Sequence, residues 1–554
     1  MPCGRLGIVT RQALNDQDTS EPDDAPAGQT PALYARLRDR VLRRRRPEAS
    51  VQRAYPGWMK AERRTCCVTD GPLISVIMPA YRTPHELLLA AITSVRGQSY
   101  RNWELCVAHD GSTSMQVLAV SAAMDRRIRP VRQAADAGIA AAMNDALAIA
   151  TGDIVAFLDH DDQLAPHALA RVAAELAAYP NTELIFSDED QLVHEDGQIV
   201  TEDGVPEEGI RSMPYFKPGW NPDLMLAQNL VCHLAVYRRS LITSLGGFRR
   251  ACDGSQDYDL ALRAIARGAA IRHIPEILYH WRQTDFSFSL QRGAVCERAA
   301  RRALSDHLGA AGTPVPLAAT PQWTRIVFPL PQDPPKLSLI LPPGGTAPAD
   351  PAYPNTEILH GEPNAMAAAS SGDILVFLGP GLLPASPGWL AELAAQSLRP
   401  GIACAGGRID HPNGRISQSG LTLHPDHIAL TLCPGSDAAD PGYRGQFVLA
   451  RTVSAVSAQC LAIRRDVFRA AGGFAADMGP YADVDLCLRL AEQNLRCVWT
   501  PHACLRGPAS PAKPEPGAAA RMRARWGALL AADPYFNPNL AITAGTLTLA
   551  TRPP

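Results

Sequence analysis

Three carboxylates follow one another at the point where an apolar segment of the sequence ends. In AFLDHDDQLAP (156–166), Asp159, Asp161 and Asp162 come directly after a run that is typical of a buried strand. Carboxylates at a strand end can hold a divalent metal ion, and Asp159-x-Asp161 provides two such ligands. For Asp162, capping of the next helix remains open, because Pro166 and a helical pattern follow.

The elements around this segment alternate between strand and helix patterns from Pro72 onward. The segments that are expected to be strands are LISVIMPAY, NWELCVAHD, DIVAFLD and TELIFSDED. Such alternation predicts a mostly parallel sheet covered by helices. Ligands bind these sheets at the carboxyl ends of the strands. Asp110 and residues 159–162 both stand at such ends.

An internal repeat divides the chain into two copies of one pattern. The paired segments are 151–169 with 371–390, 236–248 with 462–474, and 257–280 with 483–506. One register held over so many positions predicts two α/β domains of the same fold in tandem.

The second copy is shorter and has lost most of the polar residues. Asp159 and Asp161 correspond to Gly379 and Gly381. Segment 337–371 is less than half as long as the matching segment 73–151, and we expect the missing part to include the strand and turn that carry Asp110. The sequence therefore predicts a truncated, degenerate second domain.

The composition restricts the class of protein. The 554 residues include 53 basic and 55 acidic side chains, with a formal charge of -2, so a nucleic-acid partner is not expected. The 13 cysteines form no CxxC pair, which disfavours a zinc site and a disulfide framework and favours a cytoplasmic protein. No signal peptide or membrane span is recognisable.

Domain boundaries follow from the repeat and from local composition. The predicted units are a disordered N-terminus (1–30), a basic helical or linker segment (31–71), the first α/β domain (72–312), a Pro-rich linker (313–335), the degenerate domain (336–545) and a C-terminal tail (546–554). Within 33–64, a basic amphipathic pattern predicts either a solvated linker helix or peripheral contact with the inner face of the plasma membrane.

The motifs of the first copy, in order, resemble those of family-2 inverting glycosyltransferases of GT-A fold. They are SVIMPAY, AHDGS, ATGDIVAFLDHDD, GSQDYDLALR and LYHWR. The segments YFKPGWNPDLML and DPYFNPNL further resemble two-domain bacterial members that act in cell-surface polysaccharide assembly. The resemblance implies metal-dependent transfer of a hexosyl or deoxyhexosyl group from a nucleotide sugar to a glycan or lipid-linked saccharide.

The resemblance also implies roles at the donor side. Asp110 would accept a hydrogen bond from the base, which suits the ring N–H of a UDP- or dTDP-sugar. Pro79, Ala80, Tyr81 and Asp136 would line the same nucleotide pocket.

The metal ligands and the base are implied in the same way. Asp159, Asp161 and His280 would hold Mn or Mg, and Trp281 and Arg282 would shape that end of the site. The general base that takes the acceptor's proton would be Asp257.

Other polar residues near the site are assigned supporting or acceptor-side roles. These residues are Gln256, Asp259, Asp188 and Asp190. Glu189 is interpreted as a solvated strand end, and His233 as a core or pocket residue. The alternative function is a non-catalytic scaffold of a glycan-assembly complex, since the second copy is degenerate.

Overall fold

The computed structural model describes residues 47–62, 66, 68–111, 115–133, 138–193, 210–283, 291–508, 515–543 and 545–551. The predicted N-terminal segment 1–30, Asp136, and the apolar residues Leu33, Leu37 and Val41 of the basic segment lie outside this part of the chain.

The first copy is built on a nine-stranded mixed sheet. Its strands, in spatial order, are β3 (Ile128–Arg132), β2 (Trp103–His109), β1 (Ile74–Ala80), β4 (Ile154–Phe157), β8 (Ala235–Arg238), β6 (Leu184–Val193), β9 (Ile271–Arg282) and β5 (Gln163–Leu164), with β7 (Ile210–Tyr215) paired to β6. Its helices are α3 (His85–Arg96), α4 (Met115–Met124), α5 (Ile139–Ala148), α6 (Ala168–Ala178), α7 (Pro222–Met225), α8 (Arg239–Ser244), η1 (Arg250–Cys252), α9 (Gln256–Ala266), α11 (Gly293–Leu308) and η2 (Gly309–Ala311).

Apolar cores cover both faces of this sheet. Every residue of β1 is buried, and Val76 and Met78 join one core while Ile77 joins the other. Successive side chains of a strand point to opposite faces, which is why this strand is apolar apart from Ser75. The predicted α/β class is confirmed.

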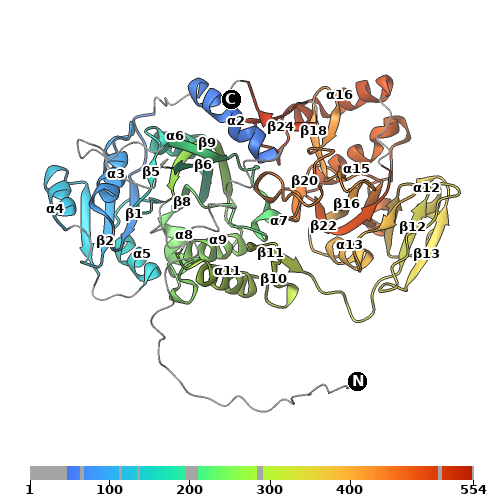
Figure 1. Ribbon diagram of the computed structural model, residues 1–554, viewed down its shortest axis with the longest axis horizontal. Coiled ribbons are helices and arrows are strands. Elements are labelled where there is room, and N and C mark those ends of the chain that lie inside the picture. The colour runs from blue at the N-terminus through green and yellow to red at the C-terminus, as the bar shows by residue number, and fades with distance from the viewer. Residues whose placement is uncertain are drawn as a thin grey trace, which may run out of the picture. The chain divides into compact units, whose positions relative to one another are not determined.

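The second copy repeats the strand order of the first. Its sheet runs β13 (Thr356–His360), β12 (Leu337–Leu341), β14 (Ile374–Leu378), β21 (Cys460–Arg464), β16 (Ile402–Asp410), β22 (Arg496–Arg506) and β15 (Leu383–Pro384), with β17 (Ile416–Gln418) paired to β16 and β20 (Arg451–Val453) paired to β22. The helices are α12 (Pro363–Ala369), α13 (Trp389–Ser397), η3 (Tyr443–Gly445), α14 (Arg465–Ala470), η4 (Ala476–Tyr481), α15 (Ala482–Ala491) and α16 (Pro516–Ala531). Figure 1 colours the first copy blue to green and the second yellow to red.

The registers of the two sheets make residue equivalences explicit. Asp190 lies opposite His280 between β6 and β9, and Asp410 lies opposite Arg506 between β16 and β22. These pairs have the offsets of the sequence repeat, so equivalent positions can be compared directly.

One expectation about the shorter copy is wrong. The strand equivalent to β2 is present as β13, which pairs with β12 in parallel. No helix or strand is assigned to residues 342–355, where the first copy has α3, and only Gly361 and Glu362 separate β13 from α12, where the first copy has α4 and β3. The second copy has therefore lost covering elements and an edge strand rather than the strand that precedes the Asp110 turn.

A buried Ser–Glu–Gly hydrogen-bond unit recurs in both copies. Ser75 Oγ donates to Glu104 Oε1 (2.7 Å) and accepts from Gly152 N (2.9 Å). The second copy repeats both contacts, from Ser338 Oγ to Glu357 (2.5 Å) and from Gly372 N to Ser338 Oγ (2.9 Å). The unit fixes the start of the strand that leads to the acidic segment in the first copy.

The segments predicted as linker and tail contain ordered hairpins. The stretch 313–335 includes β10 (Thr313–Leu317) and β11 (Thr320–Val327), which pair antiparallel, and Ile326 joins the first copy's core. The C-terminus forms β23 (Leu540–Thr543) and β24 (Thr546–Leu549), and a further hairpin joins β18 (Leu421–His424) to β19 (Ile428–Thr431).

Helix α2 (Pro47–Ala61) turns its apolar residues toward protein. Val51, Tyr55 and Trp58 are buried in a cluster that includes Phe216 and Leu547. The apolar face of this described part of the basic segment is therefore already covered. Within the described residues, no helix combines the length and apolar character needed to cross a membrane.

The motif segments 215–226 and 533–540 meet in the structure. Asn537 Nδ2 donates to Asp188 Oδ2 (2.8 Å) and to the carbonyl of Lys217 (2.7 Å). Asn221 Nδ2 donates to the carbonyl of Thr452 (2.9 Å). These contacts join the second copy to the strand of the first copy that carries Asp188.

Candidate functional site

The carboxyl ends of β1, β2 and β4 lie side by side at one edge of the first sheet. Ala80 pairs with His109, and Ile77 pairs with Phe157, both in parallel. Pro79, Ala80, Asp110 and Asp159 therefore leave neighbouring strands at the same edge, where ligands bind in open α/β sheets.

The predicted nucleotide side has a tight turn after β2. Pro79 and Ala80 are buried, Tyr81 is 45% exposed and Asp110 is partly buried. Gly111 has φ +85°, and a Cβ there would lie 3.2 Å from the Arg132 guanidinium. The turn thus requires glycine, and it brings a cation beside the predicted base-binding acid.

The three acids after β4 differ in environment. The side chain of Asp159 is 46% exposed and that of Asp161 is 16% exposed, whereas Asp162 is buried. Asp162 accepts hydrogen bonds from Tyr279 Oη (2.5 Å) and from the Arg282 backbone N–H (2.7 Å).

The helix-capping alternative for Asp162 is wrong. Helix α6 begins at Ala168 with His167 at its N-cap position, and no side chain caps it. Asp162 instead ties the acidic segment to β9, and Arg282 Nε donates to the carbonyl of Asp161 (3.0 Å). Arg282 therefore shapes this end of the site through the backbone.

The acids also influence each other's ionisation. Partial removal of water raises the pKa of Asp159, Asp161 and Asp257 raise it further, and His233 lowers it. Burial, followed by repulsion from Asp161 and Asp159, raises the pKa of Asp162 well above its usual range. Negative charge is thus concentrated where a cation would be favoured.

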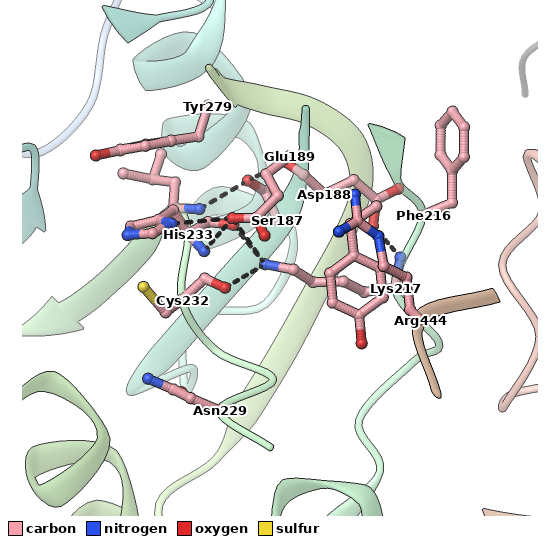
Figure 2. Close-up of polar contacts among 12 residues, drawn as sticks. Ser187, Asp188, Glu189, Phe216, Lys217, Asn229, Cys232, His233, Tyr279 and Arg444 are labelled. Atoms are coloured by element: carbon pink, nitrogen blue, oxygen red, sulfur yellow. Dashed lines mark hydrogen bonds and ion pairs between the residues drawn. The ribbon is translucent and has the colours of Figure 1, made fainter. Parts of the chain in front are cut away.

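His233, which the sequence analysis interpreted as a core or pocket residue, lies beside these acids. His233 Nδ1 lies 3.0 Å from Glu189 Oε2, and its Nε2 lies 4.0 Å from Asp159 Oδ2. Its ring stacks on Tyr279, with centroids 4.5 Å apart, and the Trp281 ring is 6.1 Å away. Figure 2 shows His233 between Tyr279 and Glu189.

Glu189 is not a solvated strand end. Its side chain is only 12% exposed, and the Lys217 Nζ lies 3.9 Å from its carboxylate. Burial opposes ionisation, but Lys217 and His233 outweigh it and lower the pKa of Glu189 to about 2. Burial alone would lower the pKa of His233, but Glu189 and then Asp159 raise it.

The donor set fits a divalent cation. Ligand atoms of Asp159, Asp162 and His233 lie within 4.8 Å of one another. Carboxylates and an imidazole suit Mn²⁺ or Mg²⁺ when phosphate oxygens and water complete the coordination. The side chain of Asp161 adjoins this group, with His160 Nδ1 3.9 Å from its carboxylate.

A second close group consists of three cysteines in the other copy. Cys404 Sγ lies 3.2 Å from Cys497 Sγ and 4.0 Å from Cys487 Sγ, and all three are buried among apolar side chains. Buried thiols of this kind pack as small apolar groups.

The predicted base stands at the start of α9. Asp257 is half-buried, and Asn229 Nδ2 donates to its Oδ2 (2.8 Å). Asp257 also contributes to the raised pKa of Asp159. The hydrogen bond from Asn229, a residue that the sequence analysis did not select, fixes one carboxylate oxygen of Asp257.

Two neighbours of Asp257 have contacts within the fold. Gln256 Oε1 accepts from Gly254 N (3.0 Å) at the helix start. Asp259 is buried and pairs with Arg249 and Arg263. These contacts hold the start of α9 in place.

Asp188, Asp190 and His280 belong to buried networks along β6 and β9. Asp188 accepts from the Lys217 N–H (2.8 Å) and contacts His273 Nε2 (2.8 Å). Asp190 accepts from Tyr55 Oη (2.5 Å) and lies 2.5 Å from His280 Nδ1. Among the described residues, His280 is part of no group with metal-ligand spacing.

Sequence reasoning missed the supporting residues Asn229, Lys217 and Glu189. The segment QNLVCHLAVYRR carried a signal, because it places an amide and a histidine just before the apolar strand β8. Only the fold shows that this loop faces the acidic segment.

Comparison with known proteins identifies the class of the first copy. Residues 75–246 match the family model described as glycosyl transferase family 2. This part of the chain is therefore a glycosyltransferase family 2 domain, which agrees with the resemblance in its motifs.

Curated relatives extend the likeness to most of the chain. An uncharacterized protein, y4gI, from Sinorhizobium fredii is 34% identical over 87% of this chain and 59% of its own length. The O-antigen biosynthesis protein RfbC from Myxococcus xanthus is 30% identical over 90% of this chain and 43% of its own length. The chain thus spans about half the length of these two relatives.

A shorter match has a more specific name. The Escherichia coli protein WfgD, named as a UDP-Glc:alpha-D-GlcNAc-diphosphoundecaprenol beta-1,3-glucosyltransferase, is 42% identical over 17% of this chain and 36% of its own length.

Proposed function

We propose that this chain is a metal-dependent inverting glycosyltransferase. It moves a hexosyl or deoxyhexosyl group from a UDP- or dTDP-sugar to a glycan acceptor in cell-surface polysaccharide synthesis. The observation that carries the proposal is the group of Asp159, Asp162 and His233, which have metal-ligand spacing, in a chain whose residues 75–246 match the glycosyl transferase family 2 model.

The donor binds across the ends of β1, β2 and β4. Asp110 accepts from the base, and Pro79, Ala80 and Tyr81 line the pocket. Asp159 and Asp161 would hold a divalent cation, which would supply positive charge to stabilise the departing diphosphate.

The acceptor hydroxyl attacks the anomeric carbon from the side opposite the diphosphate. A bond forms between this oxygen and the carbon as the bond from the carbon to the phosphate oxygen breaks. The hydroxyl proton passes to the Asp257 carboxylate, which Asn229 holds in position. The nucleoside diphosphate leaves as an anion, and the anomeric configuration is inverted.

A lipid-linked saccharide at the inner face of the plasma membrane is the acceptor class that we favour. Support comes from the printed name of WfgD, which specifies a diphosphoundecaprenol-linked sugar. The name of RfbC supports the broader assignment to O-antigen synthesis.

A donor screen with Mn²⁺ tests the proposal. The purified chain is incubated with UDP- and dTDP-sugars and saccharide acceptors, and product configuration is read by NMR. We expect transfer with inversion, and Asp257→Asn should lower kcat by roughly 10²- to 10⁴-fold. Retention of configuration, or full activity of Asp257→Asn, would reject the mechanism. Absence of donor binding would favour the scaffold alternative.

A further inference from the structure

His233 is held in a single orientation by contacts on two sides of its ring. Its Nδ1 and its backbone N–H both contact Glu189 Oε2, at 3.0 and 2.7 Å. Because that carboxylate is an acceptor, Nδ1 carries a proton and Nε2 is the nitrogen that faces Asp159.

Buried groups hold Glu189 itself. Lys217 is fully buried, and its Nζ donates to the carbonyls of Cys232 (3.0 Å) and His233 (2.5 Å) while lying 3.9 Å from Glu189 Oε2. The Lys217 ammonium group thus links the backbone carbonyls before and after the His233 Cα to Glu189, the carboxylate partner of the histidine. Figure 2 shows these contacts converging on Lys217.

Tyr279 supports the other side of the arrangement. Its ring stacks on His233 with an interplanar angle of 15°, and its hydroxyl lies between Asp162 Oδ2 (2.5 Å) and the Asp159 backbone N–H (3.2 Å). One side chain therefore sets both the plane of the imidazole and the position of the acidic segment.

We propose that His233, through Nε2, is the imidazole ligand of the divalent cation, together with Asp159, and that Glu189 is its positioning residue. Two ligand atoms that are each about 2.1 Å from one ion lie at most ~4.2 Å apart. The separation of 4.0 Å between His233 Nε2 and Asp159 Oδ2 satisfies this limit. A carboxylate that fixes the tautomer and orientation of a ligating histidine is a recurrent arrangement in metal sites.

The assignment differs from that of His280, which the family resemblance implied as the imidazole ligand. The Nδ1 of His280 contacts Asp190, which also accepts from Tyr55 and Arg211 on the side of α2 and β7. Within the described residues, two groups have metal-ligand spacing; one of them contains His233, and neither contains His280.

The second copy provides an internal comparison. At the positions equivalent to Asp159, Glu189 and His233 it has Gly379, Ile409 and Gln459. The second copy therefore lacks the aspartate ligand, the carboxylate that orients the histidine, and the histidine itself. The substitution His233→Gln accordingly installs a side chain that this fold already accommodates.

Mn²⁺ binding to the full chain tests this inference, which rests on the proposed function. Binding of the metal alone is measured by calorimetry and by the electron paramagnetic resonance signal of free Mn²⁺. We expect His233→Gln and Glu189→Gln each to weaken binding by roughly 10- to 100-fold. His280→Gln is the matched control and should bind within about twofold of the wild type.

Thermal unfolding of each variant separates lost ligation from lost structure. His233→Asn serves as a second variant if His233→Gln is unstable. Unchanged Mn²⁺ affinity in a folded His233 variant, or a loss confined to His280→Gln, would overturn the assignment. So would absence of Mn²⁺ binding by the wild type. These outcomes differ from failure of the proposed function, in which the wild type binds Mn²⁺ and transfers no sugar from any donor.

Discussion

The two copies share one framework and differ at one edge of the sheet. Asn144 makes paired hydrogen bonds with the backbone of Phe248 (both 2.9 Å), and Asn364 makes the same pair with Phe474 (2.9 and 3.0 Å). Yet five polar residues of the first copy's candidate site have different equivalents in the second copy. The changes are Asp159 to Gly379, Asp162 to Leu382, Glu189 to Ile409, His233 to Gln459 and Tyr279 to Leu505.

This difference separates what the fold needs from what the chemistry needs. The strand β14 and the helix α13 form without acids between them, so the acids are not required to end the strand or begin the helix. In the second copy, Leu382 and Leu505 replace Asp162 and Tyr279, and both pack in one apolar core cluster. The concentration of charge in the first copy therefore opposes stability, and the proposed metal binding and catalysis would explain its presence.

Replacing the acids with the residues of the second copy should have the largest effect. In Asp159→Gly combined with Asp161→Gly, loss of the cation ligands removes several kcal/mol of transition-state stabilisation, which is on the order of a 10³-fold fall in kcat. Transfer assays measure this change. The unfolding midpoint should stay close to that of the wild type, since the second copy folds with glycines. Retained transfer would contradict the role of these acids.

Asn229 offers a smaller change at the base. The equivalent residue is Ala455, and Asn229→Ala removes the donor to Asp257 Oδ2. A hydrogen bond to a charged group contributes about 1.5–3 kcal/mol, so kcat should fall roughly 10- to 100-fold with little change in KM. Asn229→Gln is the conservative comparison and should recover part of the loss. An effect on KM alone would show that Asn229 binds substrate instead.

The shared Ser–Glu–Gly unit predicts an effect on acid stability. Burial opposes ionisation of Glu104, but hydrogen bonds from Ser75, Thr151 and Arg129 lower its pKa to about 2. Its contribution to stability is therefore present above its usual pKa near 4.5 and is lost as the pH falls toward 2. Glu104→Gln should destabilise the chain by roughly 1–3 kcal/mol at pH 7 and by less at pH 3.

Urea unfolding at both pH values measures this difference. The hydrogen bonds of Lys336, Ser338 and Ser371 likewise lower the pKa of Glu357 against its burial. Glu357→Gln should follow the same pH trend with a smaller amplitude, since its side chain is 23% exposed against 8% for Glu104. If Glu357→Gln destabilised the chain more than Glu104→Gln does, or by the same amount at both pH values, the two Ser–Glu–Gly units would not be equivalent.

The smallest effect is expected at Asp483, which is equivalent to Asp257. Asp483 accepts from the backbone N–H of Ala458 (2.9 Å), and burial raises its pKa to about 6. Since the second copy lacks the other acids, Asp483→Asn should leave sugar transfer within about twofold of the wild type. A loss of kcat comparable to that of Asp257→Asn would show that the second copy takes part in the reaction.

The fold was predictable because the internal repeat and the alternation of strand and helix patterns can both be recognised directly in the sequence. The positions of Asp159 and Asp257 followed from strand and helix ends in the same way. His233 and Glu189 did not, since their pairing depends on the register between β6 and β8. The hairpin β10–β11 was missed because its proline content resembles a linker. Strand β13 was missed because its residues are only partly buried or exposed, so it has no buried apolar run of the kind seen in β12.

The contact between Asn537 and Asp188 bears on how such a tandem protein can evolve. Asp188 is fully buried, and one of its hydrogen-bond donors comes from the segment after the second sheet. Deleting that segment would leave a buried carboxylate with one fewer donor, which is costly in a low-dielectric interior. This dependence would favour retention of the second copy even though its residues equivalent to Asp159 and Asp161 are glycines.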